Sequence, residues 1–533
     1  MLLRDVAYGQ LPRRARSEKH RHAAAWIEAL GRPEDHAELR AYHFKQALEL
    51  GRAAGLPDDR SLVVRTREAL QAAGERALAL SAYGAAAELF ADALALAEDD
   101  DASRPRLLLL RARAIFALGG AGLDLLTEAI EGFRAAGDVE GFAEAATIAA
   151  RFSWYAGDRL TSDRLIADAL AAVADRSATR ARAEALTAQA GFSMLGGSFD
   201  DSIRIGAEAL PLVESLGMKE QRARLHIVVG CARCCLGDAG GLTEIESGIS
   251  IAEAAGAVEQ LDVGWANLSS ELHFFGRLDE ARRAWLRELE LAERYGLGRH
   301  LRSARALGVG WSLLDGRWDE AMSVADDLLA AADAGERDYF DPIVLAQRAW
   351  IRLGRDDVTG ADRDSERAVA DARASDLQAI AAAFPIRATV ALALGRTAEA
   401  DALASELAAI GPPLIPALCS PFPTLAEVAW LFRELGRGSE LVEVLLDPDP
   451  IKSPWNDAAR AICDGELARA ARVVDGIGHS AAGAYTWLHA AETGGGDADV
   501  QARKAEAGGF FRTAGAIRFL SDVRLTGARD RPA

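Results

Sequence analysis

Lysine is scarce in this chain: among 533 residues there are five, at positions 19, 45, 219, 452 and 504. None follows a glycine, whereas a nucleotide-binding P-loop requires Gly-Lys so that the ammonium group reaches the phosphates. The sequence therefore excludes a P-loop ATPase, and it shows no recognisable metal-binding aspartates of a nucleotide cyclase. The nine histidines form no metalloprotease motif. We therefore expect no catalytic residues, no metal and no cofactor, and a protein that is not an enzyme.

Long apolar segments, cysteines and positive charge are also in short supply. No apolar run approaches the roughly 18 residues that cross a bilayer, and the start MLLRDVAYG places Arg4 and Asp5 where a signal peptide would be apolar. Five cysteines do not make a disulfide scaffold in 533 residues, so we expect a cytoplasmic protein without a membrane partner. The net charge of −19 argues against a nucleic-acid partner, because phosphate binding needs a basic surface.

Aromatic residues are few as well, at 6 %, although half of all residues are apolar. Alanine and leucine dominate the apolar half, and this composition favours helices over strands. A chain of 533 residues is too long for one compact core. We therefore expect either several helical domains or an array that grows by repetition.

A repeated hexapeptide favours the array. The frame reads GRLDEA at 276–281 and GRWDEA at 316–321, and its glycine, here called the marker glycine, has equivalents along the chain. The series comprises Gly157, Gly197, Gly237, Gly276, Gly316, Gly354, Gly395 and Gly436, with successive differences of 40, 40, 39, 40, 38, 41 and 41. A weaker continuation runs through Gly84 and Gly120. A period between about 20 and 50 residues is typical of a solenoid.

Each marker glycine lies between two helical patterns. In the segment that follows Gly276, the residues Leu278, Ala281, Trp285, Leu289 and Ala292 fall on one face of a helix. The glycine ends the first helix in the left-handed conformation, and the Asp-Glu pair favours the positive end of the next helix dipole. Each unit is thus predicted to be a helical hairpin that stacks on the next one.

The frame LG(D/R)xxEA, with small residues on both sides of the turn, resembles tetratricopeptide repeats, in the longer variant found in bacterial regulatory ATPases. The resemblance implies an all-α, right-handed α-solenoid of about ten hairpins. We divide the chain into an N-terminal junction at 1–60, the repeat array at 61–440 and irregular C-terminal hairpins with a cap at 441–533. Prolines at 411–424 and 447–457 interrupt the later repeats, because proline cannot sit inside a helix.

The N-terminal junction carries a second resemblance. RDVAYGQLPR at 4–13, EKHRHAAAWIE at 18–28 and PEDHAELRAYHF at 33–44 resemble the segment after the ATPase module in actinobacterial-type class III adenylate cyclase / STAND ATPase multidomain proteins. The resemblance implies that this chain corresponds to the C-terminal, sensor portion of such a protein, either separated from its catalytic domains or begun at an internal methionine.

Three cysteines lie close together in GCARCCLG, at positions 231, 234 and 235. Zinc would need two further ligands, and the nearest candidate is His226. On a first helix these side chains are more simply small packing residues, so we predict no metal site.

The resemblance to tetratricopeptide repeats also implies a groove lined by first helices, at positions 13, 10, 6 and 3 before the marker glycine. The groove-binding candidates are Glu144, Thr147, Arg151, Trp154, Glu184, Thr187, Arg224, Ser270, His273, Asp341 and Arg348. Carboxylates, guanidinium groups and a tryptophan suit an acidic or extended peptide held by charged hydrogen bonds and stacking. The alternative is that they are ordinary solvated residues of a groove wall.

We therefore expect a non-catalytic module that binds a protein or peptide partner, and that restrains a cyclase or ATPase module until a ligand binds. Two alternatives stay open. One is a stand-alone adaptor that scaffolds other proteins. The other is a protein classified as an adenylate cyclase or ATPase by family although the catalytic domains are absent.

Overall fold

The computed structural model describes residues 8–31, 36–176, 178–418, 420–448, 453–493 and 498–521. Within these ranges the chain forms 28 α-helices and one short π-helix, and no strand occurs. The expected all-α fold is confirmed. None of the helices in these ranges is both long enough and apolar enough to cross a membrane.

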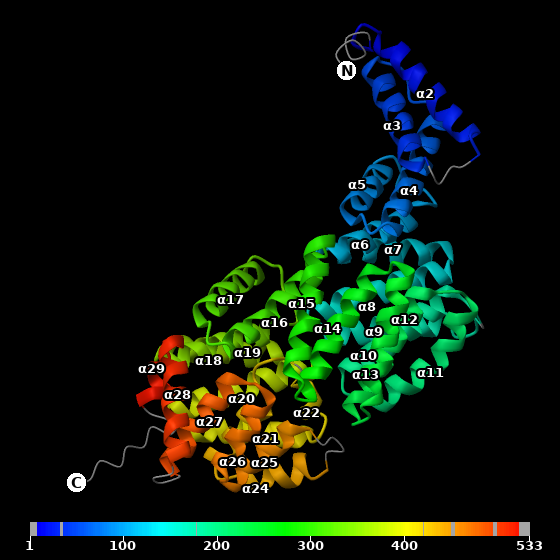
Figure 1. Cartoon of the computed structure of the whole chain (residues 1–533). Helices are drawn as coiled ribbons and strands as arrows, with labels where there is room; N and C mark the ends of the chain where they lie inside the picture. Colours follow the sequence, from blue (N-terminus) through cyan, green and yellow to red (C-terminus); the bar gives the residue numbers. More distant parts are fainter. Residues whose placement is uncertain are drawn as a thin grey trace. The chain divides into compact units, whose positions relative to one another are not determined.

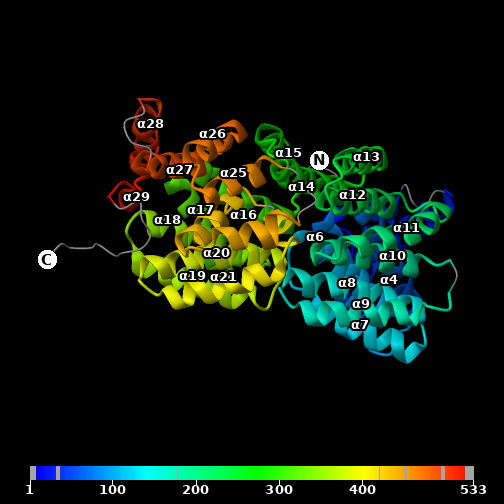
Figure 2. The same ribbon diagram turned by 90° about the horizontal axis from the view of Figure 1, so that it is seen from below.

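The helices follow one another with short connections (Figures 1 and 2). Up to the first strong repeat they are α2 Arg13–Ala29, α3 Ala37–Ala53, α4 Arg60–Ala79, α5 Tyr83–Leu94, α6 Arg104–Leu118, α7 Leu123–Ala136, α8 Val139–Tyr155 and α9 Arg159–Ala172. The regular array continues with α10 Arg180–Leu195, α11 Phe199–Ser215, α12 Lys219–Cys235, α13 Gly240–Ala255, α14 Val258–Phe274, α15 Leu278–Tyr295, α16 Gly298–Leu314, α17 Trp318–Asp333, α18 Asp341–Gly354, α19 Val358–Ala372, α20 Leu377–Ala393 and α21 Thr397–Ile410. The remaining elements are α22 Leu414–Ala417, α23 Leu425–Glu434, α24 Gly438–Leu441, the π-helix η1 Val442–Leu446, α25 Pro454–Asp464, α26 Leu467–Ile477, α27 Ser480–Thr493, α28 Ala498–Ala514 and α29 Ile517–Ser521.

The chain forms two compact units. Unit 1 contains the residues up to Phe152 together with Asp168–Asp175 and Leu297–Arg299, and unit 2 contains Ser153–Ala167, Arg176–Gly296 and the residues from His300 onward. The three-part division at 60 and 440 stays a prediction.

Unit 2 shows how the hairpins stack. The first helix α12 packs against its own second helix, α13, and also against the first helices of the neighbouring hairpins, α10 and α14. The pairs α10 and α12, α12 and α14, and α18 and α20 repeat this arrangement. Because one hairpin cannot bury its apolar face alone, stacking creates a continuous core. This is the packing of a tetratricopeptide-like solenoid.

The marker glycines adopt the predicted conformation in seven of the eight hairpins. Gly157, Gly197, Gly237, Gly276, Gly316, Gly395 and Gly436 all have φ between 71° and 87°. Gly395 illustrates the turn: its amide donates to Leu392 O, and the amide of Arg396 donates to Ala391 O, before α21 begins at Thr397. A residue with a side chain would be strained at this φ.

Gly354 is the exception, and here the predicted turn is wrong. Gly354 is the last residue of α18 and lies against the ring of Trp318, whereas the left-handed residue of this hairpin is Asp356, with φ of 67°. Asp356 lies 40 residues after Gly316 and 39 before Gly395, so the corrected series is more regular than the predicted one. In the two weak units the left-handed residues are Ser81 and Gly119, in place of Gly84 and Gly120.

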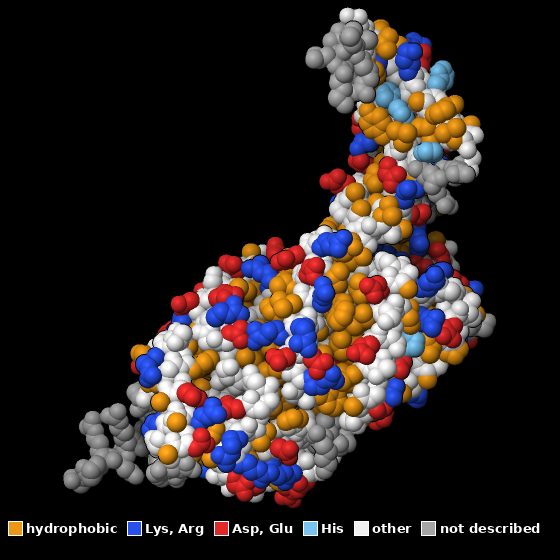
Figure 3. Space-filling model, in the orientation of Figure 1, with side chains coloured by type: hydrophobic (Ala, Val, Ile, Leu, Met, Phe, Trp, Pro, Cys, Tyr) orange, Lys and Arg blue, Asp and Glu red, His pale blue; other side chains and the backbone are white. Residues whose placement is uncertain are grey.

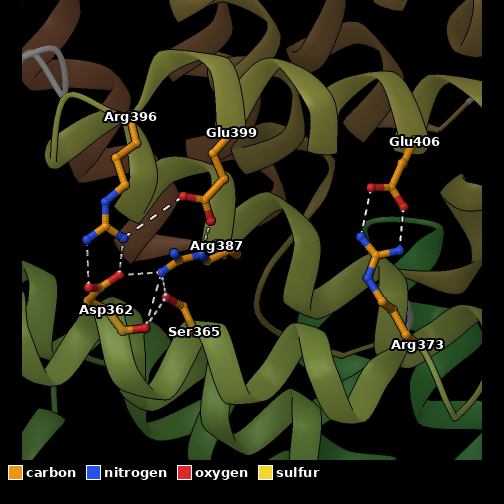
Figure 4. Close-up of polar contacts among 7 residues, drawn as sticks. All are labelled: Asp362, Ser365, Arg373, Arg387, Arg396, Glu399 and Glu406. Atoms are coloured by element: carbon orange, nitrogen blue, oxygen red, sulfur yellow. Dashed lines mark hydrogen bonds and ion pairs between the residues drawn. The ribbon is translucent and has the colours of Figure 1, made fainter.

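An ion-pair network fastens α19, α20 and α21 together (Figure 4). Arg387 of α20 donates to Asp362 of α19 and to Glu399 of α21, at 2.5 and 2.6 Å. Arg396, which follows the marker glycine, binds Asp362 of the preceding hairpin with both of its terminal nitrogens, at 2.8 and 3.1 Å. In this unit the arginine of the repeat frame therefore connects one hairpin to the previous one.

The C-terminal segment packs back on the array inside unit 2. Trp455 of α25 donates its indole N–H to His273 O of α14 at 2.9 Å, and Gln347 of α18 donates to Phe422 O at 2.9 Å. The ring of Phe519 in α29 lies 5.0 Å from that of Trp350 in α18. Figures 1 and 2 both place α29 beside α18. Part of the first-helix face is thus covered by the chain's own C-terminal residues.

Candidate functional site

A cavity of about 120 Å³ lies within unit 2, and we call it the inner cavity. Its walls come from first helices α10, α12, α14 and α16, with contributions from α15, α20 and the segment around α22. The polar side chains that line it are Arg224, Asn267, Ser270, Glu271, Glu288, His300, Ser303 and Gln378, and the aromatic ones are Tyr155, Phe199, Tyr339 and Phe340.

The lining residues recur at fixed positions of the repeat. Arg224, Val263 and Ser303 each lie 13 residues before the left-handed glycine of their hairpin, at Gly237, Gly276 and Gly316. Val228, Asn267 and Leu307 lie nine residues before the same glycines. Further lining residues lie six residues before (Gly191, Ser270) and two residues before (Leu195, Cys235). Spacings of 4, 3 and 4 describe one stripe along a helix.

The predicted groove positions agree with this stripe at 13 and 6 residues before the glycine and differ at the other two. Of the predicted candidates, Arg224 and Ser270 line the inner cavity. The positions 10 and 3 residues before the glycine point into the helix packing. Thr147 and Thr187 are buried there and donate their hydroxyls to Ala143 O and Ala183 O of their own helices.

The two aromatic candidates are buried as well. Trp154 stacks on Phe192 with ring centroids 5.0 Å apart, and the guanidinium group of Arg159 lies 4.0 Å from its ring. His273 lies 5.5 Å from the ring of Trp455, and burial lowers the pKa of His273 to about 3. His273 is therefore neutral at physiological pH, and neither ring faces the inner cavity.

The remaining candidates make ion pairs or ring contacts elsewhere. In unit 1, Glu144 accepts a hydrogen bond from Arg106 at 2.5 Å, and Arg151 lies over the ring of Phe116 at 4.5 Å. Glu184 is half-buried on α10 of unit 2.

Asp341 and Arg348 were placed by counting back from Gly354, which is not the turn residue. Counted from Asp356, the equivalent residues are Ile343 and Trp350, both buried. Asp341 instead accepts from Arg302 at 2.8 Å, and Arg348 binds Asp364 of α19 at 2.7 and 2.9 Å. Ligand binding by the candidate residues stays a prediction.

Buried carboxyl groups distinguish the inner cavity. Glu288 of α15 is 1 % exposed, and none of the described residues gives its Oε2 a hydrogen bond. Burial first, and then the nearby Asp262, raise the pKa of Glu288 well above its ordinary value. Asp262 is fully buried, with its Oδ2 2.8 Å from Nδ1 of His300.

Glu271 of α14 is the second buried carboxyl in the wall. Burial raises the pKa of Glu271 to about 8, opposed by weak hydrogen bonds from the thiols of Cys235 and Cys231. The Cys235 thiol lies 3.8 Å from Glu271 Oε1. At neutral pH this carboxyl is therefore mostly protonated in the empty cavity.

The clustered cysteines lie in the interior of α12. Cys231, Cys234 and Cys235 are buried and unbridged, and burial raises the pKa of the Cys231 and Cys234 thiols far above the ordinary value. Across the described part of the chain, no group of three or more His, Cys, Asp or Glu side chains could hold a metal ion. His226 instead contacts Glu244 at 2.6 Å.

Sequence reasoning missed Glu288 and Glu271. Along α15 the apolar pattern predicts Leu289 on the buried face, yet Leu278, Ala281, Ala284, Glu288 and Ala292 are the buried residues. Because α15 has eight other charged residues, the sequence alone does not single out the one that turns inward. A register taken from the alanines at 281, 284 and 292 would have placed Glu288 on that face.

The fold and its repeating inner face define a tetratricopeptide-like helical repeat protein. No protein-family model matches the chain, and no curated protein matches it in sequence.

Several solved structures are similar to this chain at low identity. One is a Rap protein complexed with competence and sporulation factor, at 14 % identity and a TM-score of 0.44, covering 73 % of this chain and 99 % of that one. Another is a STAND protein with a tetratricopeptide repeat sensor from Pyrococcus horikoshii, at 12 % identity and a TM-score of 0.37, covering 63 % of this chain. This chain spans about half of that protein, at 49 %. Yeast Tom70 matches at 11 % identity with a TM-score of 0.32, covering 95 % of this chain and 97 % of that one.

Proposed function

We propose that this chain is a non-catalytic binding module that takes its ligand in the inner cavity. The observation that carries the proposal is the convergence of four successive first helices on one cavity through equivalent positions of their repeats. A concave surface built from stacked repeats is the binding surface that such arrays offer. Polar groups from α12, α14 and α16 give this cavity the means to orient a ligand.

The cavity suits a small molecule or one side chain of a peptide better than a long extended peptide. The segment that follows α21 covers the neighbouring part of the first-helix face: Ser420 and Phe422 O both accept hydrogen bonds from Gln347. Pro413 and Pro416 of the same segment form one edge of the inner cavity. A ligand would therefore enter a pocket rather than lie along an open groove.

Cavity filling tests this proposal. Ser303→Leu should narrow the inner cavity, while the matched change Ser247→Leu lies on the exposed face of α13. A thermal-shift panel of amino acids, amines, carboxylates and short peptides should contain compounds that stabilise the wild type and Ser247→Leu but not Ser303→Leu. A panel in which every active compound stabilises all three proteins equally would contradict binding in the cavity.

The proposed role is regulatory, as the N-terminal resemblance to cyclase and ATPase signalling proteins implies. Support comes from unit 1, where α2 and α3 expose Trp26 and Tyr42 to 64 % and 53 %. Leu30 at the end of α2 and Leu39 of α3 are exposed as well, and Figure 3 shows hydrophobic and histidine side chains gathered over α2 and α3. Exposed apolar residues concentrated in one place favour a docking surface, here for an ATPase or cyclase module.

Co-purification tests the regulatory role. The chain would be expressed with any P-loop protein encoded beside its gene, and Trp26→Ser with Tyr42→Ser should abolish their co-purification. Leu160→Ser is the control, because Leu160 is 85 % exposed on α9. Equal loss with Leu160→Ser would contradict docking on α2 and α3. Stable capture of unrelated proteins alone would favour the alternative, a stand-alone adaptor.

A further inference from the structure

We infer that the inner cavity recognises a cationic nitrogen group, an alkylammonium or a guanidinium, through the carboxyl groups of Glu288 and Glu271. This inference rests on the proposed function, since it names the ligand chemistry of the same cavity. The group could belong to a small amine or to a basic side chain of a peptide.

The burial of Glu288 is the strongest single observation in favour of a cationic ligand. This residue belongs to the buried stripe of α15, whose other members are Leu278, Ala281, Ala284 and Ala292. A leucine or alanine would serve packing at this place, whereas a buried carboxyl whose Oε2 has no partner among the described side chains is unfavourable. Since Glu288 also lines the inner cavity, a ligand that donates a hydrogen bond would supply the missing partner.

The excess of carboxyl groups around the cavity favours a cation, which would promote their ionisation. Glu271 and Glu288 line it, and Asp262 lies behind Glu288. Against these three carboxyls stand Arg224 and His300, and His300 is held by Asp262. An anionic ligand would oppose the ionisation of the two buried carboxyls. A cationic ligand would instead make charge-assisted hydrogen bonds with them, and such bonds are about twice as strong as neutral ones.

Size and aromatic content agree with an organic cation. A cavity of about 120 Å³ approaches the roughly 150 Å³ that is enough for a benzene-sized molecule in an engineered protein cavity. Tyr155 and Tyr339 line the cavity with their ring centroids 5.5 Å apart, and aromatic faces attract cations. A metal ion fits less well, because no set of three metal-ligating side chains exists in the described ranges.

Binding of a cation should release protons. In the empty cavity burial raises the pKa of both carboxyls, that of Glu271 to about 8, so Glu271 is mostly protonated at neutral pH. A neighbouring positive charge favours the carboxylate form. Each carboxyl that ionises on binding passes its proton to the buffer, so the heat of binding should change with the ionisation enthalpy of the buffer.

The test is calorimetric titration of the full chain with agmatine, as the small amine, and with the peptide acetyl-Gly-Arg-Gly-amide, as the peptide source. At least one should bind, with proton release, and Glu288→Gln should weaken it about tenfold, the loss expected for one charge-assisted hydrogen bond. Glu290→Gln is the matched control, since Glu290 is exposed on the same helix. Tighter binding of agmatine than of the peptide would assign the site to small amines, and the reverse to basic peptides.

Two outcomes would overturn the inference. Binding of neither cation, or equal binding to wild type and Glu288→Gln, would mean that Glu288 is merely a buried residue of the helix packing. If a neutral or anionic compound then still stabilises the wild type and not Ser303→Leu, the cavity binds a ligand of another class. In that case the proposed function stands and only the cationic specificity fails.

Discussion

Arg387 of α20 donates from Nη1 to Asp362 of α19 at 2.5 Å, although only 5 % of Arg387 is exposed. The same guanidinium group binds Glu399 of α21 at 2.6 Å, so a single side chain holds three helices together (Figure 4). A buried charge with two carboxylate partners is costly to disturb, because its removal takes a close charged partner from two partly buried carboxylates at once.

This relationship predicts unequal effects for two arginines, Arg387 and Arg373, that are both drawn in Figure 4. Arg387→Ala should lower the free energy of unfolding by about 2–3 kcal/mol. Arg373→Ala removes a bidentate ion pair with Glu406, in which the side chains of Arg373 and Glu406 are 51 % and 43 % exposed. The loss of this exposed pair should lower the free energy of unfolding by less than about 1 kcal/mol. Urea unfolding of both variants measures the difference, and equal losses would show that the Arg387 network does not stabilise the array.

The left-handed turns predict a second contrast. Gly395 has φ of 74° and free space around its Cα, so Gly395→Ala introduces backbone strain without a clash and should cost about 1 kcal/mol. Gly476 also has free space but lies inside α26, with ordinary helical φ, so Gly476→Ala should stabilise by about 0.5–1 kcal/mol. Opposite shifts of the thermal midpoint are expected. Shifts of the same sign would argue against the assigned turn.

Glu271 predicts a dependence of stability on pH. In the folded protein the pKa of Glu271 is about 8, raised by burial, while in the unfolded chain it returns to about 4.5. Between these values the folded state binds more protons than the unfolded state. The contribution of Glu271 to the free energy of unfolding is therefore fully present below about pH 4.5 and is lost as pH rises to about 8. Glu271→Gln should flatten this fall, measured as the urea midpoint at pH 5, 6.5 and 8. An identical pH profile in wild type and variant would contradict the assigned pKa.

Arg224 discriminates between two ligand classes. If the cavity held an acidic peptide, as the predicted groove residues suggested, Arg224→Gln should abolish its binding. If the cavity holds a cation, the same change removes a competing positive charge and should strengthen agmatine binding several-fold. Arg283→Gln with Arg287→Gln, both exposed on α15, is the control and should change neither affinity.

A further prediction concerns catalysis. The purified chain should neither hydrolyse ATP nor form cyclic AMP, because the sequence lacks a P-loop and a recognisable cyclase metal site. Phosphate release and cyclic AMP would be measured across the fractions of successive columns. Turnover that follows the chain through every column would show that it is an enzyme.

The period of the array could be predicted from the sequence because it rests on glycine, which alone tolerates the left-handed turn at no steric cost. The prediction was wrong where another residue takes that conformation, as Asp356 does at φ of 67°. That error of two residues displaced the candidates Asp341 and Arg348 from the first-helix stripe. A turn formed by aspartate leaves a weaker signal than one formed by glycine.

The lining of the site was predictable only in part. The positions of Arg224 and Ser270 follow from counting along a helix. Trp154 and His273 are buried instead, because the residue that lines the cavity lies two positions before the glycine and not three. Glu288 comes from a second helix and reaches the cavity only because of how α15 packs on α14. The spacing of residues within one hairpin does not predict tertiary packing of this kind.

Because the wall of the inner cavity is shared among α10, α12, α14 and α16, no single hairpin encodes the pocket. Repeat arrays commonly evolve by duplication or loss of a whole unit. Between α10 and α16 such an event would bring together side chains that had never been neighbours and would erase the existing specificity in one step. Evolution of a new ligand preference should therefore proceed here by point substitution within a fixed number of repeats, and changes in repeat number should be tolerated only outside this stretch.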